Sequence, residues 1–200
     1  MEYGFYAMLN RMKLINRWSL MRNTSQENIQ EHSLQVAILA HALAILRREK
    51  FPEDRICPSP EHVAVLAIFH DASEIITGDM PTPIKYFNPK LREAYQVAED
   101  AANDRLLGML PEEMRPHYQP YLNGADSEED LAARELVKAA DKLAAYIKCV
   151  EELAQGNNEF KLAKIQCKQK VDEMGLKEVD YFMEQYMPAF ERSLDELQAD

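Results

Sequence analysis

The chain has 200 residues, of which 46% are hydrophobic and 28% charged, and its formal net charge is −11. This length suits one domain with a substantial core, and the composition is typical of a soluble globular protein. So acidic a chain would repel a long polyanion, which argues against nucleic-acid binding. The longest apolar run, residues 34–46, is shorter than the roughly 18 to 20 residues of a membrane span. The N-terminus lacks a secretory-signal pattern, so we expect no membrane partner.

The three cysteines, Cys57, Cys149 and Cys167, are odd in number and widely spaced. They form neither a disulfide framework nor a CxxC pair, and this pattern indicates reduced thiols. Reduced thiols favour a cytoplasmic location.

The first half of the chain reads as helices joined by short loops. A first helix is predicted over residues 3–15, and a polar loop over residues 22–27 follows. Asn28 and Glu31 have the spacing of a capping box, which predicts a helix from there to about Arg48. Apolar residues line two faces of this helix, one through Val36, Leu39 and Leu43 and another through Leu34, Ile38 and Ile45. A helix that is apolar on two faces is central, so we expect His32 inside the protein.

In the rest of the chain, prolines and helix-capping residues mark where the predicted helices begin and end. Ser59-Pro60 predicts the start of a helix that runs through His70 and stops at Gly78, before a loop stiffened by two prolines. Asn88-Pro89 predicts a helix to about residue 110, and three prolines break the next stretch into short turns. The longest helix is expected from residue 127 to 156, followed by helices over 158–173 and from 176 onward. The fold class is therefore all-α, and we expect residues 1–200 to form a single domain.

Two histidines and two aspartates in three predicted apolar helical segments are candidate metal ligands: His32, His70, Asp71 and Asp141. Imidazole nitrogen and carboxylate oxygen together suit a divalent transition metal with open positions for water. Such a site would place the metal core at about residues 28–155. The helices over 158–195 would then pack on this core or form a dimer interface.

Asp141 lies in the apolar run 137–147, where a carboxylate costs several kcal/mol unless a cation or hydrogen bonds compensate it. An ion pair with Lys138 or Lys142 at the helix surface is the alternative.

Helix geometry limits the size of the site. His41 is about half a turn out of phase with His32, and His62 lies about 12 Å along the axis from His70. His117 falls in the proline-broken stretch, so the sequence favours one metal ion rather than two. Glu74 follows His70 by four residues, on the same face of the predicted helix.

The order His, then His-Asp, then Asp resembles the signature of the HD-domain phosphohydrolases, all-α metal-dependent enzymes that act on phosphate esters. The chain is similar in more detail to the bacterial 5'-deoxynucleotidases of the YfbR type. The segments that carry this likeness are residues 14–18 (LINRW), 27–28 (EN) with 31–37 (EHSLQVA), 70–74 (HDASE), 77–79 (TGD) with 81–87 (PTPIKYF), and 149–154 (CVEELA) with 156–160 (GNNEF).

The resemblance implies hydrolysis of deoxyribonucleoside 5'-monophosphates to deoxynucleoside and phosphate by a homodimer. One divalent cation, cobalt, manganese or another transition metal, would be held by His32, His70, Asp71 and Asp141. Arg17 would clamp the phosphate, Glu74 would orient water or shuttle a proton, and Asp71 would join them in catalysis. The implied substrate contacts are Arg17, Trp18, His32, Asp71, Asp79, Met80, Pro81, Thr82 and Asp141.

Discrimination between sugars is also implied. Trp18 would wall the sugar or base, Asp79 would accept a hydrogen bond from the 3'-hydroxyl, and Thr82 would help exclude a 2'-hydroxyl. Without the resemblance, Arg17 and Glu74 read as surface residues, Trp18 reads as core, and Gly78-Asp79 simply ends a helix.

Other functions stay open at this point. The chain is also compatible with another HD-type activity on nucleoside triphosphates or cyclic nucleotides, with a non-catalytic nucleotide sensor, or with a purely structural helical protein. The metal identity and the base preference are not encoded in a readable motif. A dimer interface is expected from the C-terminal aromatics Tyr181, Phe182, Tyr186 and Phe190, whose alternative is internal packing.

Overall fold

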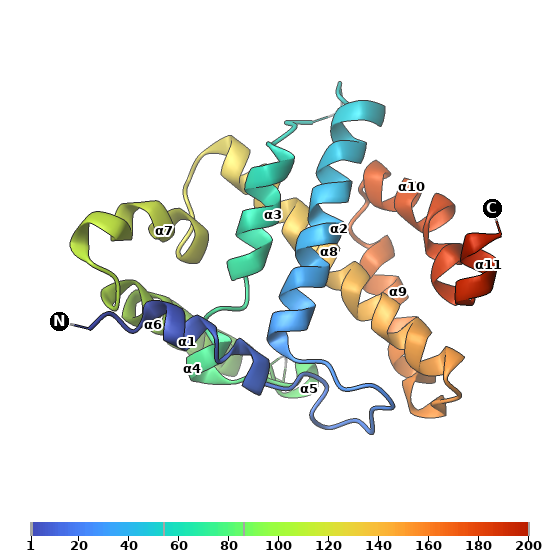
Figure 1. Cartoon of the computed structure of the whole chain (residues 1–200), viewed down its shortest axis with the longest axis horizontal. Coiled ribbons are helices and arrows are strands. Elements are labelled where there is room, and N and C mark those ends of the chain that lie inside the picture. Colours follow the sequence, from blue (N-terminus) through green and yellow to red (C-terminus); the bar gives the residue numbers. More distant parts are fainter. Residues whose placement is uncertain (1, 54, 86, 200) are drawn as a thin grey trace.

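Two long helices that cross near the middle of the molecule organise the fold, in a computed structural model that describes residues 2–53, 55–85 and 87–199 (Figure 1). They are α2 (Ile29–Lys50) and α8 (Glu128–Ala154), and α3 (Pro60–Phe69) packs against both. Small and branched apolar residues fill the crossing, among them Val36, Leu43 and Leu143, which are fully buried. This burial provides the main driving force for bringing the three helices together.

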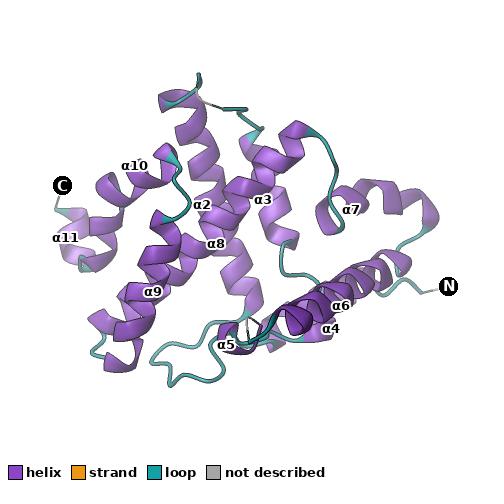
Figure 2. Ribbon diagram, turned by 180° about the vertical axis from the view of Figure 1, so that it is seen from behind, coloured by secondary structure: helices purple, strands orange, loops and turns teal. Residues whose placement is uncertain are grey.

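Shorter elements flank the crossing on two sides (Figure 2). One side holds α1 (Phe5–Leu9), α4 (Glu74–Thr77), α5 (Thr82–Lys85), α6 (Pro89–Gly108) and α7 (Arg115–Leu122). The other holds α9 (Lys161–Asp172), α10 (Lys177–Gln185) and α11 (Leu194–Gln198). Single 3-10 turns are η1 (Met12–Leu14), η2 (Glu112–Met114), η3 (Asn158–Phe160) and η4 (Met187–Glu191). No strand occurs in the described ranges, so the predicted all-α class is confirmed.

The predicted helix starts are confirmed by their caps. The Asn28 side chain accepts hydrogen bonds from the backbone of α2, and Glu31 completes the capping box. Ser59 accepts from the backbone of His62, and Ser127 accepts from the backbone of Asp130. These caps satisfy N–H groups that the first helical turn leaves without partners.

Three of the predicted elements were wrong in extent. The helix predicted over residues 3–15 is α1 followed by the 3-10 turn η1. The prolines after residue 110 do not produce only turns, since Pro116 lies in the first turn of α7, where its missing N–H costs nothing.

The helix predicted through residue 78 ends at Phe69 and resumes as α4. The chain turns over residues 70–73, and Gly78 (φ +76°) then ends α4 in a conformation that favours glycine. The turn places both His70 and Asp71 at the end of α3.

By length and hydropathy α2 resembles a membrane span, yet in this fold it is the core helix. It carries His32 and Arg47 buried inside the protein, and Arg47 pairs there with Glu178 of α10. A core helix passes the same length and hydropathy test.

Candidate active site

The four predicted ligands converge from three segments. His32 lies in the first turn of α2, His70 and Asp71 follow the end of α3, and Asp141 lies in the middle of α8. One ligand atom each of His32, His70 and Asp141 lies within 4.8 Å of the others. The Asp71 Oδ2 atom lies 3.1 Å from His70 Nε2 and 3.6 Å from His32 Nε2. The fold therefore brings together residues that are up to 109 positions apart.

The His70 ring is oriented for ligation through Nε2. The Ala67 carbonyl accepts a hydrogen bond of 2.7 Å from Nδ1, so the ring hydrogen sits on Nδ1 and the lone pair on Nε2. Among the described residues the buried Nε2 atom has no aligned hydrogen-bond partner, although Asp71 is close. A lone pair directed at a carboxylate is unfavourable unless a cation lies between them, so this arrangement fits a metal ion.

The surroundings of His32 also favour a positive charge beside its ring. Its Nε2 atom lies 3.0 Å from Asp141 Oδ1, and its ring is fully buried. Burial and the charge of Arg17 act to lower the pKa of His32, but its contacts with Asp141 and Glu27 outweigh them and raise this pKa to about 9. Positive charge is therefore favoured between His32 and Asp141, which fits a divalent cation at this position.

Asp141 contacts His32 and Arg17, as expected of a residue in the cluster. Burial acts to raise the pKa of Asp141, but the hydrogen bond with His32 lowers it to about 2. The alternative of a surface ion pair with a flanking lysine is not what the contacts show, because Lys142 Nζ lies 2.9 Å from Met174 Sδ.

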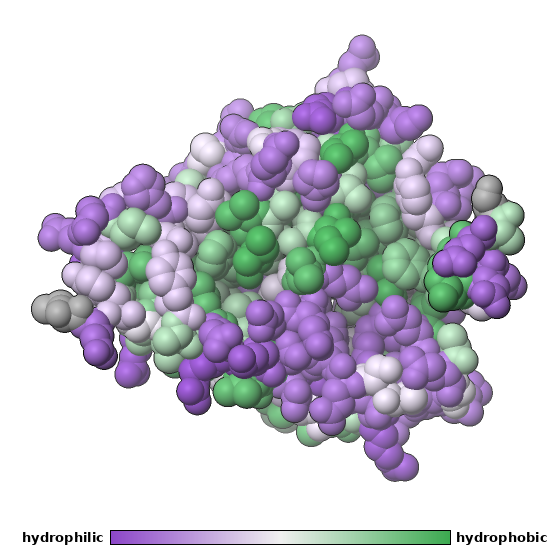
Figure 3. Space-filling model, viewed as in Figure 1, coloured by the Kyte–Doolittle hydropathy of each residue, from purple (hydrophilic) through white to green (hydrophobic). Residues whose placement is uncertain are grey.

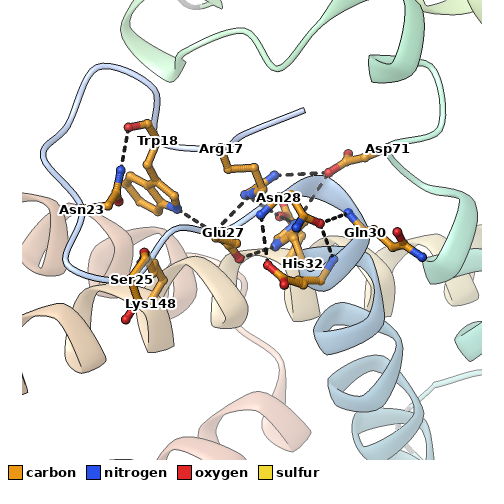
Figure 4. A network of polar contacts seen from close by, with 12 residues as sticks. Arg17, Trp18, Asn23, Ser25, Glu27, Asn28, Gln30, His32, Asp71 and Lys148 are labelled. Carbon is orange, nitrogen blue, oxygen red and sulfur yellow. Dashed lines mark hydrogen bonds and ion pairs between the residues drawn. The ribbon is translucent and has the colours of Figure 1, made fainter. Parts of the chain in front are cut away.

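Arg17 lies beside the cluster, on the segment between η1 and α2 (Figure 4). Its Nη1 atom donates to Asp71 Oδ2 at 3.2 Å, and its Nη2 atom lies 3.9 Å from Asp141 Oδ1. Burial acts to lower the pKa of Arg17, but Asp71 and Asp141 outweigh it and raise the pKa. The side chain is 14% exposed, so it is a charged group inside the site and not a surface arginine.

Glu74 is the first residue of α4 and is buried. Burial, together with the charges of Asp71 and Asp79, raises the pKa of Glu74 to about 9. Its Oε2 atom is buried without a hydrogen-bond partner in the described part of the chain. The chain turns between His70 and Glu74, so the two do not share one helix face as predicted. Glu74 nevertheless holds a proton close to the cluster at neutral pH.

The remaining predicted substrate contacts lie on two segments, since Trp18 follows Arg17 and residues 79–82 follow α4. Trp18 adopts a left-handed backbone conformation (φ 57°), and its ring centroid is 5.4 Å from that of Phe160. Asp79 is half-buried in the loop after α4, and burial raises its pKa. Met80 lines a cavity of about 500 Å³, and Pro81 is half-buried. Thr82 begins α5, and its side chain is outside the described residues.

The other histidines lie away from the cluster. His41 is half-buried on α2, and His117 is exposed on α7. His62 on α3 pairs with Asp130, whose Oδ1 atom is 3.5 Å from His62 Nε2. As far as the described residues show, the chain has one group of histidine and carboxylate ligands and not two.

Glu27 is a site residue to which the sequence assigned no role. Its carboxylate contacts Arg17, Trp18 and His32. It belongs to one of the segments that carry the resemblance, and it immediately precedes the Asn28 cap. A loop residue has no helical periodicity to mark the direction of its side chain, so only the family likeness signals it.

Comparison with known proteins agrees with this geometry. The profile of the 5'-deoxynucleotidase YfbR-like family matches residues 4–190. The 5'-deoxynucleotidase YfbR of Escherichia coli is 49% identical over 197 residues, covering 98% of this chain and 96% of that protein.

Solved structures share the fold. An HD-domain phosphohydrolase from Listeria innocua superposes with a TM-score of 0.77 at 21% identity, over 94% of this chain and 88% of that one. The cyanophage S-2L HD phosphohydrolase, solved with dA and one catalytic Zn²⁺ ion, has a TM-score of 0.60 at 23% identity, over 96% of this chain and all of that one. The chain therefore has the HD-domain phosphohydrolase fold and belongs to the YfbR-like family of 5'-deoxynucleotidases.

Proposed function

We propose that the protein is a metal-dependent 5'-deoxynucleotidase that converts deoxyribonucleoside 5'-monophosphates to deoxynucleosides and phosphate. The observation that carries this proposal is the convergence of two imidazoles and two carboxylates beside a half-buried arginine and a buried glutamic acid. His32, His70, Asp71 and Asp141 would hold the ion. When bound, the ion would supply Lewis acidity toward the phosphate and lower the pKa of a nearby water.

Arg17 would bind and orient the phosphate. Its guanidinium is planar and permanently charged, so two of its N–H groups can donate to two phosphate oxygens. Its contact with Asp71 at 3.2 Å directs it toward the cluster, where it would hold the phosphate beside the ion.

Glu74 would supply the proton for the leaving group. Attack by water forms a new bond from oxygen to phosphorus and breaks the bond between phosphorus and the 5'-oxygen. The 5'-oxygen then takes the proton that the buried Glu74 carboxyl holds, and the proton lost by the attacking water restores it.

The sugar would be recognised by the loop after α4. Asp79 would accept a hydrogen bond from the 3'-hydroxyl, Trp18 would wall the sugar or base, and Thr82 would exclude a 2'-hydroxyl. Two nitrogens and two oxygens suit cobalt, manganese, zinc or another transition metal, so the physiological ion depends on availability as well as on this site.

The test is phosphate release from dAMP and AMP side by side, across a panel of divalent ions, with His70→Ala as control. We expect release from dAMP in preference to AMP and none from the variant. Release of pyrophosphate or triphosphate from a nucleoside triphosphate, with none from dAMP, would favour a different HD-type reaction. Binding of dAMP without turnover under every ion would favour a nucleotide sensor.

We propose that the protein forms a homodimer and that the apolar face of α2 and α3 is the dimer interface. Figure 3 shows hydrophobic residues gathered over these two helices. Leu34 and Ile38 of α2 are 60% and 63% exposed, and Ile68 of α3 is 42% exposed. A patch of this kind on a soluble protein marks an interaction site.

The C-terminal aromatics are a weaker choice for that interface. Phe182 is buried, and Tyr181 and Phe190 pack against the core, which favours the internal alternative. Ile38→Glu should therefore convert dimers to monomers in light-scattering measurements, whereas Tyr186→Glu should not. We also place the enzyme in the cytoplasm, in keeping with its three free thiols.

A further inference from the structure

Three residues of the candidate site meet at the side chain of Glu27 (Figure 4). Its Oε2 atom accepts a hydrogen bond of 2.9 Å from Trp18 Nε1 and lies 3.5 Å from Arg17 Nε. Its Oε1 atom lies 3.3 Å from His32 Nδ1. The side chain is only 10% exposed, so these contacts are shielded from solvent.

From this arrangement we infer that Glu27 is a positioning residue that fixes a metal ligand and the phosphate clamp with one carboxylate. The inference rests on the proposed function for the roles of Arg17 and His32. Glu27 itself touches neither the substrate phosphate nor the metal in this account.

The contact with His32 sets which ring nitrogen is available. A carboxylate beside Nδ1 favours the tautomer with hydrogen on Nδ1, and the Nε2 lone pair then faces Asp141 and Asp71. Metal-binding histidines commonly have such a carboxylate behind the ring, where it fixes the orientation and raises the basicity of the ligating nitrogen. The separation of 3.3 Å is an ion-pair contact without full hydrogen-bond alignment, so a small ring adjustment would complete it.

The contacts with Arg17 and Trp18 hold a strained backbone in place. Trp18 has φ 57°, which is unfavourable for a bulky side chain and persists only where its surroundings enforce it. Glu27 binds this pair twice, because its carbonyl accepts a bond of 2.9 Å from Arg17 N while its carboxylate accepts from the indole. Removal of the Glu27 carboxylate should therefore make the position of Arg17, the phosphate clamp, less fixed, as well as that of the metal ligand His32.

The loop that returns to Glu27 is anchored to the helix that carries Asp141. Glu152 of α8 is fully buried and accepts hydrogen bonds from the backbone N–H groups of Thr24 at 2.9 Å and Ser25 at 3.1 Å. Lys148 of the same helix bridges Glu152 and the Ser25 carbonyl. These bonds fix the loop before Glu27 relative to α8. The Glu27 carboxylate is therefore positioned by its own loop as well as by its contacts with Trp18, Arg17 and His32.

The experiment compares Glu27→Ala and Glu27→Gln with Glu31→Gln in the full chain. Glu31 is a matched control, because it lies four residues away and its carboxylate serves the helix cap by accepting a hydrogen bond from the Asn28 N–H. Glutamine offers one acceptor and one donor, so it can serve His32 or the Trp18 and Arg17 pair, but not both. Should the alanine variant fail to fold, the glutamine variant, which preserves the shape, carries the test.

The readouts are calorimetric titration of chelator-treated protein with Co²⁺, the visible spectrum of the Co²⁺ protein, and kcat and KM for dAMP. We expect Co²⁺ binding about 10- to 100-fold weaker in Glu27→Ala, an intermediate loss in Glu27→Gln, and wild-type binding in Glu31→Gln. We also expect a changed spectrum and a raised KM in the Glu27 variants. Wild-type Co²⁺ affinity and spectrum in both Glu27 variants would overturn the inference. If the predicted order of Co²⁺ affinity holds while even the wild type leaves dAMP intact, the proposed function fails and the positioning role stands.

Discussion

Replacing Glu74 by glutamine should stabilise the metal-free protein while abolishing phosphate release. Burial and the charges of Asp71 and Asp79 raise the pKa of Glu74 from 4.5 to about 9. Between these two pH values the folded protein keeps the proton that the unfolded chain has released. The free energy of unfolding of the wild type therefore falls as the pH rises through this window. Glutamine cannot ionise and avoids this cost.

The size of the effect follows from the same two values. Each pH unit within the window changes the free energy of unfolding by about 1.4 kcal/mol, so the cost at pH 7, 2.5 units above 4.5, is at most about 3.5 kcal/mol. Below pH 4.5 both states are protonated, and this contribution vanishes.

The assay is urea unfolding of chelator-treated wild type and Glu74→Gln at pH 5, 7 and 8.5, with Glu93→Gln as control. Glu93 is an exposed carboxylate of α6, and Glu93→Gln makes the same chemical change at the surface. We expect the advantage of Glu74→Gln over the wild type to grow with pH and the control difference to stay flat. An advantage independent of pH, or a less stable Glu74→Gln at pH 8.5, would refute the reasoning.

Three further predictions concern the metal, the clamp and the core. Co²⁺ at 100 times its dissociation constant should stabilise the wild type by about 2.7 kcal/mol against heat or urea, and Asp141→Asn should lose most of this gain. Arg17→Lys should reduce kcat/KM for dAMP about 10- to 100-fold, because a hydrogen bond to a charged group is worth about 1.5–3 kcal/mol and the planar fork is lost; an unchanged value would remove Arg17 from phosphate binding. Arg47→Ala should destabilise the fold by about 3–5 kcal/mol in urea unfolding, because it leaves the buried Glu178 carboxylate without the guanidinium that donates to it at 2.7 Å; a loss below 1 kcal/mol would contradict this.

Local sequence signals predicted the helices well where a capping residue marks the start. Asn28, Ser59, Asn88 and Ser127 each cap a helix in the structure. They succeed because a cap is a local interaction, decided within three or four residues. The convergence of His32, His70, Asp71 and Asp141 was also predictable, because the family likeness supplies the long-range pairing that local rules lack.

The sequence was less informative where distant contacts decide the backbone. Nothing local ends α3 at Phe69, since the apolar pattern continues to Gly78. The turn that follows has the His70 ring bonded to the Ala67 carbonyl and Ala72 buried in the apolar cluster that also contains Phe5 and Leu106.

Two further misses have the same origin. Leu34 and Ile38 looked like core on the basis of periodicity, but they are 60% and 63% exposed. Periodicity shows that a helix face is apolar and does not show whether the same chain or a second copy covers it. Glu27, in a loop, had no periodic signal at all.

The most direct test of the central claim is the stoichiometry of metal binding. Chelator-treated protein would be titrated with Co²⁺ and the bound metal counted by elemental analysis. We predict one ion per chain for the wild type, for His62→Ala and for His117→Ala, and loss of the ion in His70→Ala and Asp141→Asn. Retention of the ion in the last two variants, or two ions per wild-type chain, would contradict the account.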